Sequence, residues 1–194
     1  GGGRLGAGAV AGALSQERLY RSRALKQADV VALLALFPTE LDPEVRRASY
    51  DYYERITTHD SSLSASTHAT VAAELGKTGE ALAFLRQSLA VDADDEHGDA
   101  SHGVHIANCG GNWQTIVYGF AGVRPAYAGE ALEIDPRVPE VLGPIILRLA
   151  WRASRIELTV SPHRVIARLL GGAALSVTVR GDRRKLADEE EWIL

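Results

Sequence analysis

Residues 144–181, PIILRLAWRASRIELTVSPHRVIARLLGGAALSVTVRG, decide the fold of the C-terminal part of this chain. Every second residue in 145–151 is Ile, Leu or Trp, which is the period of a half-buried strand. The same alternation recurs in three later segments, 155–160, 164–170 and 175–181. The turn-like sequences SPH (161–163) and GGAA (171–174) separate these segments. The pattern predicts an antiparallel β meander with a repeat of about ten residues.

Upstream of the meander, the sequence has the periodicity and end signals of helices joined by short connections. We predict helices over 16–37, 43–53, 64–75, 79–90 and 111–120. Ser15 would cap the first, which Pro38 would end, while Pro43 suits the first turn of the second helix. The fold class is therefore mainly α with a β tail. A proline-rich crossing (125–143) joins the two parts, and the acidic end ADEEEW (187–192) is predicted to be solvated.

The composition argues against several classes of protein. Hydrophobic residues make up 46% and charged residues 24% of the 194 residues, which is typical of a globular chain. A formal net charge of −4 provides no basic surface for nucleic acid or anionic lipid, and no apolar run is long enough to span a bilayer. The single Cys109 fits a reducing compartment. We therefore expect a cytoplasmic protein with neither a nucleic-acid nor a membrane partner.

The beginning of the sequence suggests that the chain is incomplete. It contains no Met, and its first residues, GGGRLGAGAVAGAL, are low in complexity. We expect 1–15 to be disordered or artefactual, 16–135 to be a helical domain, and 136–194 to be a β-sheet domain. About five helices would close neither a bundle nor a barrel, so we expect a C-terminal fragment of a longer protein.

The stretch TTHDSSLS (57–64) gathers hydroxyl side chains in a loop that leads into a predicted helix. Ser61, Ser62 and Ser64 could bind an anion together with the free amide groups at the start of that helix. The alternative is ordinary capping, with Ser62 or Ser64 as the N-cap residue. The spacing leaves both interpretations open.

A second polar stretch is DEHGDASHGVHIANCGG (95–111). His97, His102 and His105 with Cys109 could suggest zinc, but the spacing lacks the tight pairs of structural zinc sites. The aspartates do not fit a calcium loop, because no Glu closes the loop at the required position. Gly110 and Gly111 could instead form a turn that approaches a ligand, with His105 as a donor. A plain loop with one buried His is the remaining alternative.

Lys26 and Gln27 lie where the first predicted helix becomes apolar nearly all round. Lys26 could extend its charged end to solvent along the helix, or it could point into a polar cavity. The spacing does not decide between the two.

Several segments together resemble glycoside hydrolase family 65, whose members are mostly disaccharide phosphorylases. The resemblance covers about 19–185. Its most specific motifs are KQADV (26–30), TTHDSSLS and HIA-x-x-GG-x-W (105–113), which occur in the family's order. It implies that the chain holds the last helices of an (α/α)6 barrel followed by the family's small C-terminal β domain.

The resemblance also implies a reaction. Family members cleave an α-glucoside with inorganic phosphate and inversion, which gives β-glucose 1-phosphate and a free sugar. A carboxylic acid protonates the leaving oxygen while phosphate attacks from the opposite face. No cofactor or metal is implied beyond phosphate as co-substrate, and the full-length protein is expected to be a homodimer in the manner of many members.

The resemblance assigns roles to residues of this chain. Lys26 and Gln27 match the pair that contacts the glucose hydroxyls. The segments that form the phosphate pocket are matched by Ser61, Ser62, His105, Gly110 and Gly111. His59 and Asp60 are expected to shape that pocket.

Two departures limit the comparison. The family's general-acid Glu lies upstream of the Lys-Gln pair, and no matching segment precedes Lys26, so we assign no catalytic residue and expect the chain alone to be inactive. Cys109, Asn112 and Gln114 stand where many members have other residues. Two other functions stay open: a hydrolase of the same family, such as a trehalase, and a non-catalytic carbohydrate-binding or helical interaction module.

Overall fold

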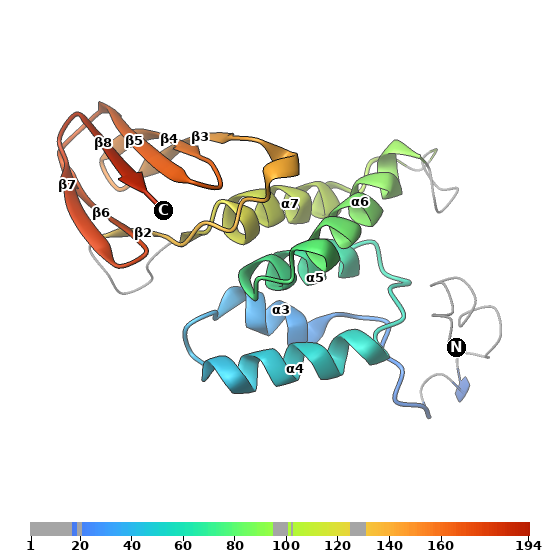
Figure 1. Cartoon of the computed structure of the whole chain (residues 1–194). Helices are drawn as coiled ribbons and strands as arrows, with labels where there is room; N and C mark the ends of the chain where they lie inside the picture. Colours follow the sequence, from blue (N-terminus) through green and yellow to red (C-terminus); the bar gives the residue numbers. More distant parts are fainter. Residues whose placement is uncertain (1–16, 19–20, 95–100, 102, 125–130) are drawn as a thin grey trace. The chain divides into compact units, whose positions relative to one another are not determined.

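The computed structural model of this chain describes residues 17–18, 21–94, 101, 103–124 and 131–194. The chain divides into two compact units that meet between Thr115 and Ile116. We call them the helical unit and the β unit; each is seen in Figure 1. The sequence placed the domain boundary after residue 135, and the predicted start at 1–15 lies outside the described residues. 

The helical unit is built from helices that follow one another along the chain. Its described helices are α3 (Asp29–Leu36), α4 (Pro43–Ile56), α5 (Ser64–Glu74), α6 (Thr78–Ala93) and α7 (Ile106–Gln114). Pro43 occupies the first turn of α4, as predicted, and the Asp42 side chain accepts hydrogen bonds from the amides of Glu44 (2.9 Å) and Val45 (3.4 Å). Within the described ranges, no helix combines the length and the apolar character required to span a membrane.

The first predicted helix, 16–37, is wrong in much of its length, because residues 21–28 are not helical. Leu25 pairs instead with Thr57 in a short parallel bridge. The Leu25 amide donates to the Ile56 carbonyl (2.8 Å), and the Thr58 amide donates to the Leu25 carbonyl (2.8 Å). Backbone groups that pair with a distant segment cannot form helical hydrogen bonds, so α3 begins only at Asp29.

The β unit contains two four-stranded sheets rather than one meander. Its strands are β1 (Val123–Arg124), β2 (Leu132–Ile134), β3 (Ile145–Trp151), β4 (Ser154–Val160), β5 (Arg164–Gly171), β6 (Leu175–Val179), β7 (Asp182–Leu186) and β8 (Glu189–Ile193). One sheet has the order β3-β4-β5-β8 and is antiparallel throughout. The other has the order β1-β2-β6-β7, with β2 and β6 parallel. The predicted fold class, helices followed by a small β domain, is confirmed.

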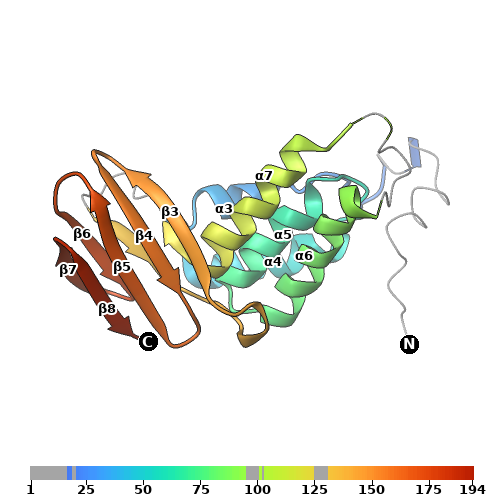
Figure 2. The same ribbon diagram turned by 90° about the horizontal axis from the view of Figure 1, so that it is seen from above.

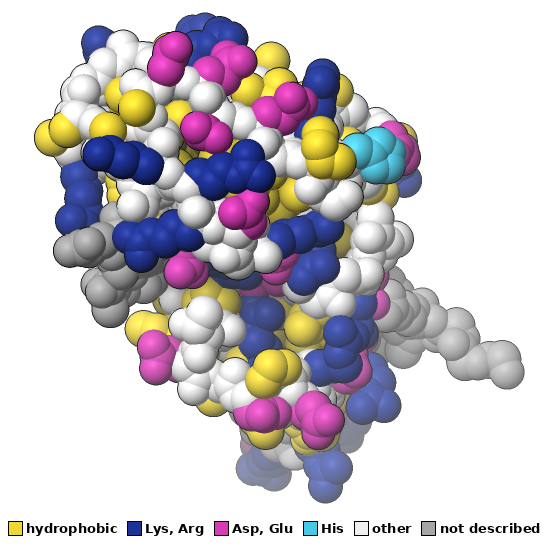
Figure 3. All heavy atoms as spheres, turned by 60° about the vertical axis from the view of Figure 1, so that its left-hand side comes forward, with side chains coloured by type: hydrophobic (Ala, Val, Ile, Leu, Met, Phe, Trp, Pro, Cys, Tyr) yellow, Lys and Arg dark blue, Asp and Glu magenta, His cyan; other side chains and the backbone are white. Residues whose placement is uncertain are grey.

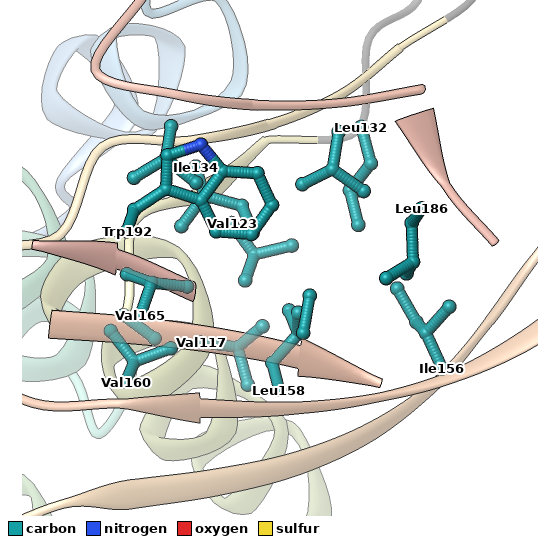
Figure 4. Close-up of a cluster of buried hydrophobic side chains, with 14 of the residues drawn as sticks. Val117, Val123, Leu132, Ile134, Ile156, Leu158, Val160, Val165, Leu186 and Trp192 are labelled. Atoms are coloured by element: carbon teal, nitrogen blue, oxygen red, sulfur yellow. The ribbon is translucent and has the colours of Figure 1, made fainter. Parts of the chain in front are cut away.

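The core of the β unit comes from the alternation seen in the sequence. Ile156, Leu158 and Val160 of β4 are fully buried on one face of their sheet, where they belong to a cluster that includes Val165 and Leu186 (Figure 4). The residues between them on β4 face outward. Burial of alternate side chains is what fixes the register of such a sheet.

The acidic end of the chain is strand β8, whose carboxylates are exposed or half-buried, in keeping with the predicted solvated end, whereas Trp192 is buried. Glu189 completes a row of alternating charges that crosses the outer face of the sheet from β3 to β8: Arg148, Glu157, Arg168 and Glu189. Arg148 Nε lies 2.8 Å from Glu157 Oε2, and Arg168 Nε lies 2.8 Å from Glu189 Oε2. Opposite charges on neighbouring strands support the pairing, and Figure 3 shows basic and acidic side chains interspersed over the β unit.

Candidate functional site

The loops that carry the predicted site residues begin from the same end of the helical unit. Helices α4 and α6 finish at this end, and α5 and α7 start there, which both Figure 1 and Figure 2 show. The TTHDSSLS loop lies between α4 and α5, and His105 immediately precedes α7. We call these two segments, 57–64 and 105–111, the loop end of the helical unit.

The start of α5 has no side-chain cap. Its N-cap residue is Leu63, so the alternative in which Ser62 or Ser64 is the N-cap residue is not what the structure has. The Ser64 hydroxyl is used elsewhere, 2.8 Å from Nδ1 of His59. Ser61 and Ser62 are half-buried side chains just before this helix start. An uncapped helix start with hydroxyl groups beside it favours an anion.

His59 fixes the conformation of this loop. Its backbone has a φ of 59°, in the left-handed region that residues other than glycine seldom adopt. Its ring packs against two rings of the helices below, His68 of α5 (centroids 4.6 Å apart) and Phe84 of α6 (4.8 Å). The packed ring and the contact with Ser64 compensate for the unfavourable backbone conformation.

A buried polar cluster supports the loop from below. His68 is fully buried, and its Nδ1 lies 2.9 Å from the Ser64 carbonyl, which can only accept, so that nitrogen carries the hydrogen. Burial lowers the pKa of His68, which keeps the ring neutral. Tyr50 of α4 is also fully buried, and its hydroxyl donates a hydrogen bond to Glu80 (2.5 Å). Burial is the main cause that raises the pKa of Tyr50, and this hydrogen bond is the second. The helices beneath the loop are thus linked by side-chain hydrogen bonds as well as by apolar packing.

His105 is held by Asp92, from the last turn of α6. Asp92 Oδ1 accepts from the backbone amide of His105 (2.9 Å) and lies 2.9 Å from its ring Nδ1. The hydrogen bond from the His105 backbone amide, and to a smaller extent the contact with its ring, lower the pKa of Asp92. Asp92 precedes the polar stretch 95–111, and no local signal in the sequence identified it as the partner of His105.

Gly110 and Gly111 lie inside α7, so the prediction that they form a turn is wrong, as is the predicted helix start at residue 111. A Cβ on Gly111 would lie 2.3 Å from the Oγ and 2.8 Å from the Cβ of Ser66, whereas a Cβ on Gly110 would meet nothing within 4 Å. Gly111 therefore allows α7 to approach the first turn of α5. The buried Thr115 hydroxyl, just after α7, donates a hydrogen bond to the Ser66 carbonyl of α5 (3.0 Å). A π-helix, Thr115–Phe120, then continues the chain.

The two glycines give a matched test of this packing. Gly111→Ala is expected to destabilise the helical unit by about 1–3 kcal/mol, because the added methyl group overlaps Ser66. Gly110→Ala is expected to stabilise it by up to about 1 kcal/mol, since alanine is the better helix former. Urea unfolding of both variants measures the difference. Equal stabilities would contradict the close contact between α5 and α7.

Lys26 and Gln27 lie outside any helix, in an exposed bend just after Leu25. Because Leu25 pairs with Thr57, this bend is attached to the first residue of the TTHDSSLS loop. The predicted glucose-contacting pair is thus brought next to the predicted phosphate loop by backbone hydrogen bonds. Asp60 is half-buried within the same loop.

The structure bears only in part on the zinc interpretation. His97 and His102 lie outside the described residues, and Cys109 lies with its sulfur 3.9 Å from Oδ2 of Asp92. Among the residues with described positions, no group of three or more His, Cys, Asp or Glu side chains could hold a metal ion.

Comparison with known proteins matches both parts of the chain. The model of the glycosyl hydrolase family 65 central catalytic domain matches residues 9–114, and that of the family's C-terminal domain matches residues 126–186. A solved structure described as a candidate kojibiose phosphorylase from the human microbiome superposes with a TM-score of 0.87 at 27% identity. The match covers 95% of this chain and 27% of that structure.

Curated relatives fall in the same family. The kojibiose phosphorylase of Caldanaerobacter subterraneus subsp. tengcongensis is 37% identical over 87% of this chain, and the alpha,alpha-trehalose phosphorylase of Geobacillus stearothermophilus is 37% identical over 89%. The maltose phosphorylase of Bacillus subtilis is 36% identical over 85%. The chain spans 22% of the length of each of these relatives. The matches to both domain models, in the order in which the two units follow each other, show that this chain belongs to glycosyl hydrolase family 65.

Proposed function

We propose that this chain provides the phosphate-binding part and some of the glucose-binding part of an inverting disaccharide phosphorylase. The observation that supports this most is the uncapped start of α5, with Ser61 and Ser62 beside it and His105 at the same end of the helical unit. The relatives named above are phosphorylases of kojibiose, trehalose and maltose, which are α-linked glucose disaccharides.

The reaction needs an anion held on one side of the sugar. A phosphate oxygen attacks the anomeric carbon of the glucosyl group as the bond from that carbon to the glycosidic oxygen breaks. A carboxylic acid gives its proton to the departing oxygen, so the products are β-glucose 1-phosphate and a free sugar. We expect that acid to be a Glu contributed from outside this chain.

In this proposal the hydroxyls of Ser61 and Ser62 donate to phosphate oxygens and replace part of the water around the anion. The amide groups at the start of α5 add the positive end of a helix dipole. His105 donates from the start of α7, and Gly110 leaves that face of the helix without a side chain. His59 and Asp60 hold the loop in shape around the anion.

Lys26 and Gln27 are proposed to contact the glucose hydroxyls. Their exposed bend is tied to Thr57, at the beginning of the phosphate loop. The two parts of the substrate site would therefore keep a fixed spacing, which a direct displacement requires, since the attacking and leaving oxygens must be in line with the anomeric carbon.

Activity is tested on the longest reading frame that contains this sequence. Kojibiose, trehalose and maltose are supplied with and without inorganic phosphate, and glucose 1-phosphate and glucose are measured. Phosphate-dependent release of glucose 1-phosphate is expected. Release of glucose alone, independent of phosphate, would replace this proposal with the hydrolase alternative.

A variant pair tests the proposed role of the loop. Replacing both Ser61 and Ser62 with Ala is expected to raise the KM for phosphate about tenfold or more, because hydrogen bonds to a charged group are lost. Thr67→Ala is the control, since that hydroxyl already donates to the Leu63 carbonyl (2.9 Å) in the first turn of the same helix. An unchanged KM in the double variant would contradict the role given to the serines.

A further inference from the structure

We propose that Asp92 is a positioning residue that holds the His105 ring with Nε2 toward phosphate and favours its protonated form. This inference rests on the proposed function, since it assumes that His105 contacts the anion. None of the motifs that identify the family includes Asp92. The proposal comes from the contacts between the end of α6 and the start of α7.

The geometry restricts which ring nitrogen can face a ligand. Asp92 Oδ1 lies 2.9 Å from Nδ1 of His105 and also accepts the His105 backbone amide at 2.9 Å. A carboxylate oxygen accepts hydrogen bonds, so Nδ1 carries a hydrogen. Two bonds to one oxygen fix both the backbone and the ring of His105, which leaves Nε2 as the nitrogen directed away from Asp92.

The charge of the ring then decides whether it can bind phosphate. If the ring is neutral with its hydrogen on Nδ1, Nε2 presents a lone pair, which repels a phosphate oxygen. Only the doubly protonated ring can donate from Nε2 while Nδ1 stays on Asp92. A carboxylate in contact with the ring stabilises this positive form.

Asp92 remains ionised over the pH range in which the His105 ring gains or loses its proton. The backbone amide and then the ring of His105 lower the pKa of Asp92, so its carboxylate is charged throughout the pH range in which an imidazole titrates. Because the folded-state pKa of Asp92 lies below the unfolded one, the stability that these bonds contribute is fully present above the unfolded pKa and is lost as the pH falls through the lower, folded-state pKa. Cys109, one turn along α7, lies beside the Asp92 carboxylate, with its sulfur 3.9 Å from Oδ2.

Asp92→Asn separates the charge from the geometry. The amide oxygen of Asn can accept the same two hydrogen bonds, and its NH₂ group can face the sulfur of Cys109, a weak acceptor. The start of α7 should therefore keep its structure, while the His105 ring loses the negative charge beside it that stabilises its protonated form. Asp94→Asn is the matched control, because it removes an acidic side chain from the same end of α6 at an exposed position.

The experiment titrates inorganic phosphate into the 194-residue chain by calorimetry from pH 5 to pH 8. Asp92→Asn is expected to weaken binding about three- to tenfold near pH 7.5 and to approach wild-type affinity near pH 5, where the ring is protonated in both proteins. Asp94→Asn is expected to follow the wild type throughout. Nitrogen-15 NMR of the His105 ring should show protonation shifted to lower pH in Asp92→Asn alone.

A His105→Gln background shows whether Asp92 acts through the ring. Asp92→Asn should have little further effect on phosphate affinity in that background. An equal loss with and without the histidine, or a loss that does not depend on pH, would overturn the inference and leave Asp92 as a cap of α7. If phosphate fails to bind the folded wild-type chain at any pH, the proposed phosphate site is wrong. The ring titration then still shows whether Asp92 sets the charge of His105.

Discussion

Replacing Glu74 with Ala is expected to lower the free energy of unfolding of the helical unit by about 3–5 kcal/mol. Glu74 of α5 pairs with Arg46 of α4, and the two side chains are only 1% and 8% exposed. Arg46 also donates to the Leu34 carbonyl of α3 (3.2 Å), so one guanidinium links three helices. Without Glu74, that positive charge would stay buried with its main counterion removed.

Urea unfolding monitored by circular dichroism measures this loss, and amide hydrogen exchange assigns it to the helical unit rather than the β unit. Glu40→Ala is the control, because Glu40 is exposed and its replacement should change stability by less than about 0.5 kcal/mol. Replacing Arg46 and Glu74 together with Met and Leu should cost much less than Glu74→Ala alone. Equal unfolding midpoints for Glu74→Ala and Glu40→Ala would show that the pair does not stabilise the fold.

Trp192→Ala is expected to destabilise the β unit by about 3–5 kcal/mol, the usual cost of removing a large buried aromatic side chain. Trp192 is 2% exposed and belongs to the core cluster of this unit (Figure 4). Its ring also lies under the Arg184 guanidinium, at 5.0 Å. The Trp192 side chain thus packs strand β8 against the core of the β unit.

Ile193→Ala is the control for this substitution, since Ile193 is the next residue on β8 and is 77% exposed. It is expected to change stability by less than about 0.5 kcal/mol. Hydrogen exchange of the β5 and β8 amides measures both variants, because these strands pair directly. Similar exchange in both variants would mean that β8 is held by its hydrogen bonds alone.

Local sequence signals predicted much of the fold. The alternation over 145–179 predicted strands β3 to β6 close to their observed bounds, and Pro43 marked the start of α4. In these segments the burial pattern repeats with the period of the element itself, so it can be read from neighbouring residues. The resemblance to family 65, made from three motifs, is confirmed by the domain models.

The predictions that are wrong concern contacts between distant segments. Leu25 pairs with the distant Thr57 instead of continuing a helix. Gly110 and Gly111 look like a turn in isolation, yet both lie in α7, and α5 packs closely against Gly111. Tertiary contacts override weak local preferences in each case.

The candidate site could be foreseen only as a set of residues. The sequence grouped Ser61, Ser62 and His105, and the structure brings their segments to one end of the helical unit. The bond between His105 and Asp92 could not be foreseen, because the two residues come from different helices and Asp92 stands among other acidic residues. The fixed ring of His59 likewise depends on packing against α5 and α6.

We propose that inorganic phosphate binds at the loop end of the helical unit. Amide chemical shifts of the nitrogen-15-labelled chain, followed while phosphate is added at constant ionic strength, test it most directly. We expect saturable shifts that concentrate at Ser61, Ser62 and His105 and are weaker in the Ser61→Ala, Ser62→Ala double variant. A folded chain with no saturable shifts there, or with shifts confined to the arginine-bearing strands of the β unit, would contradict it.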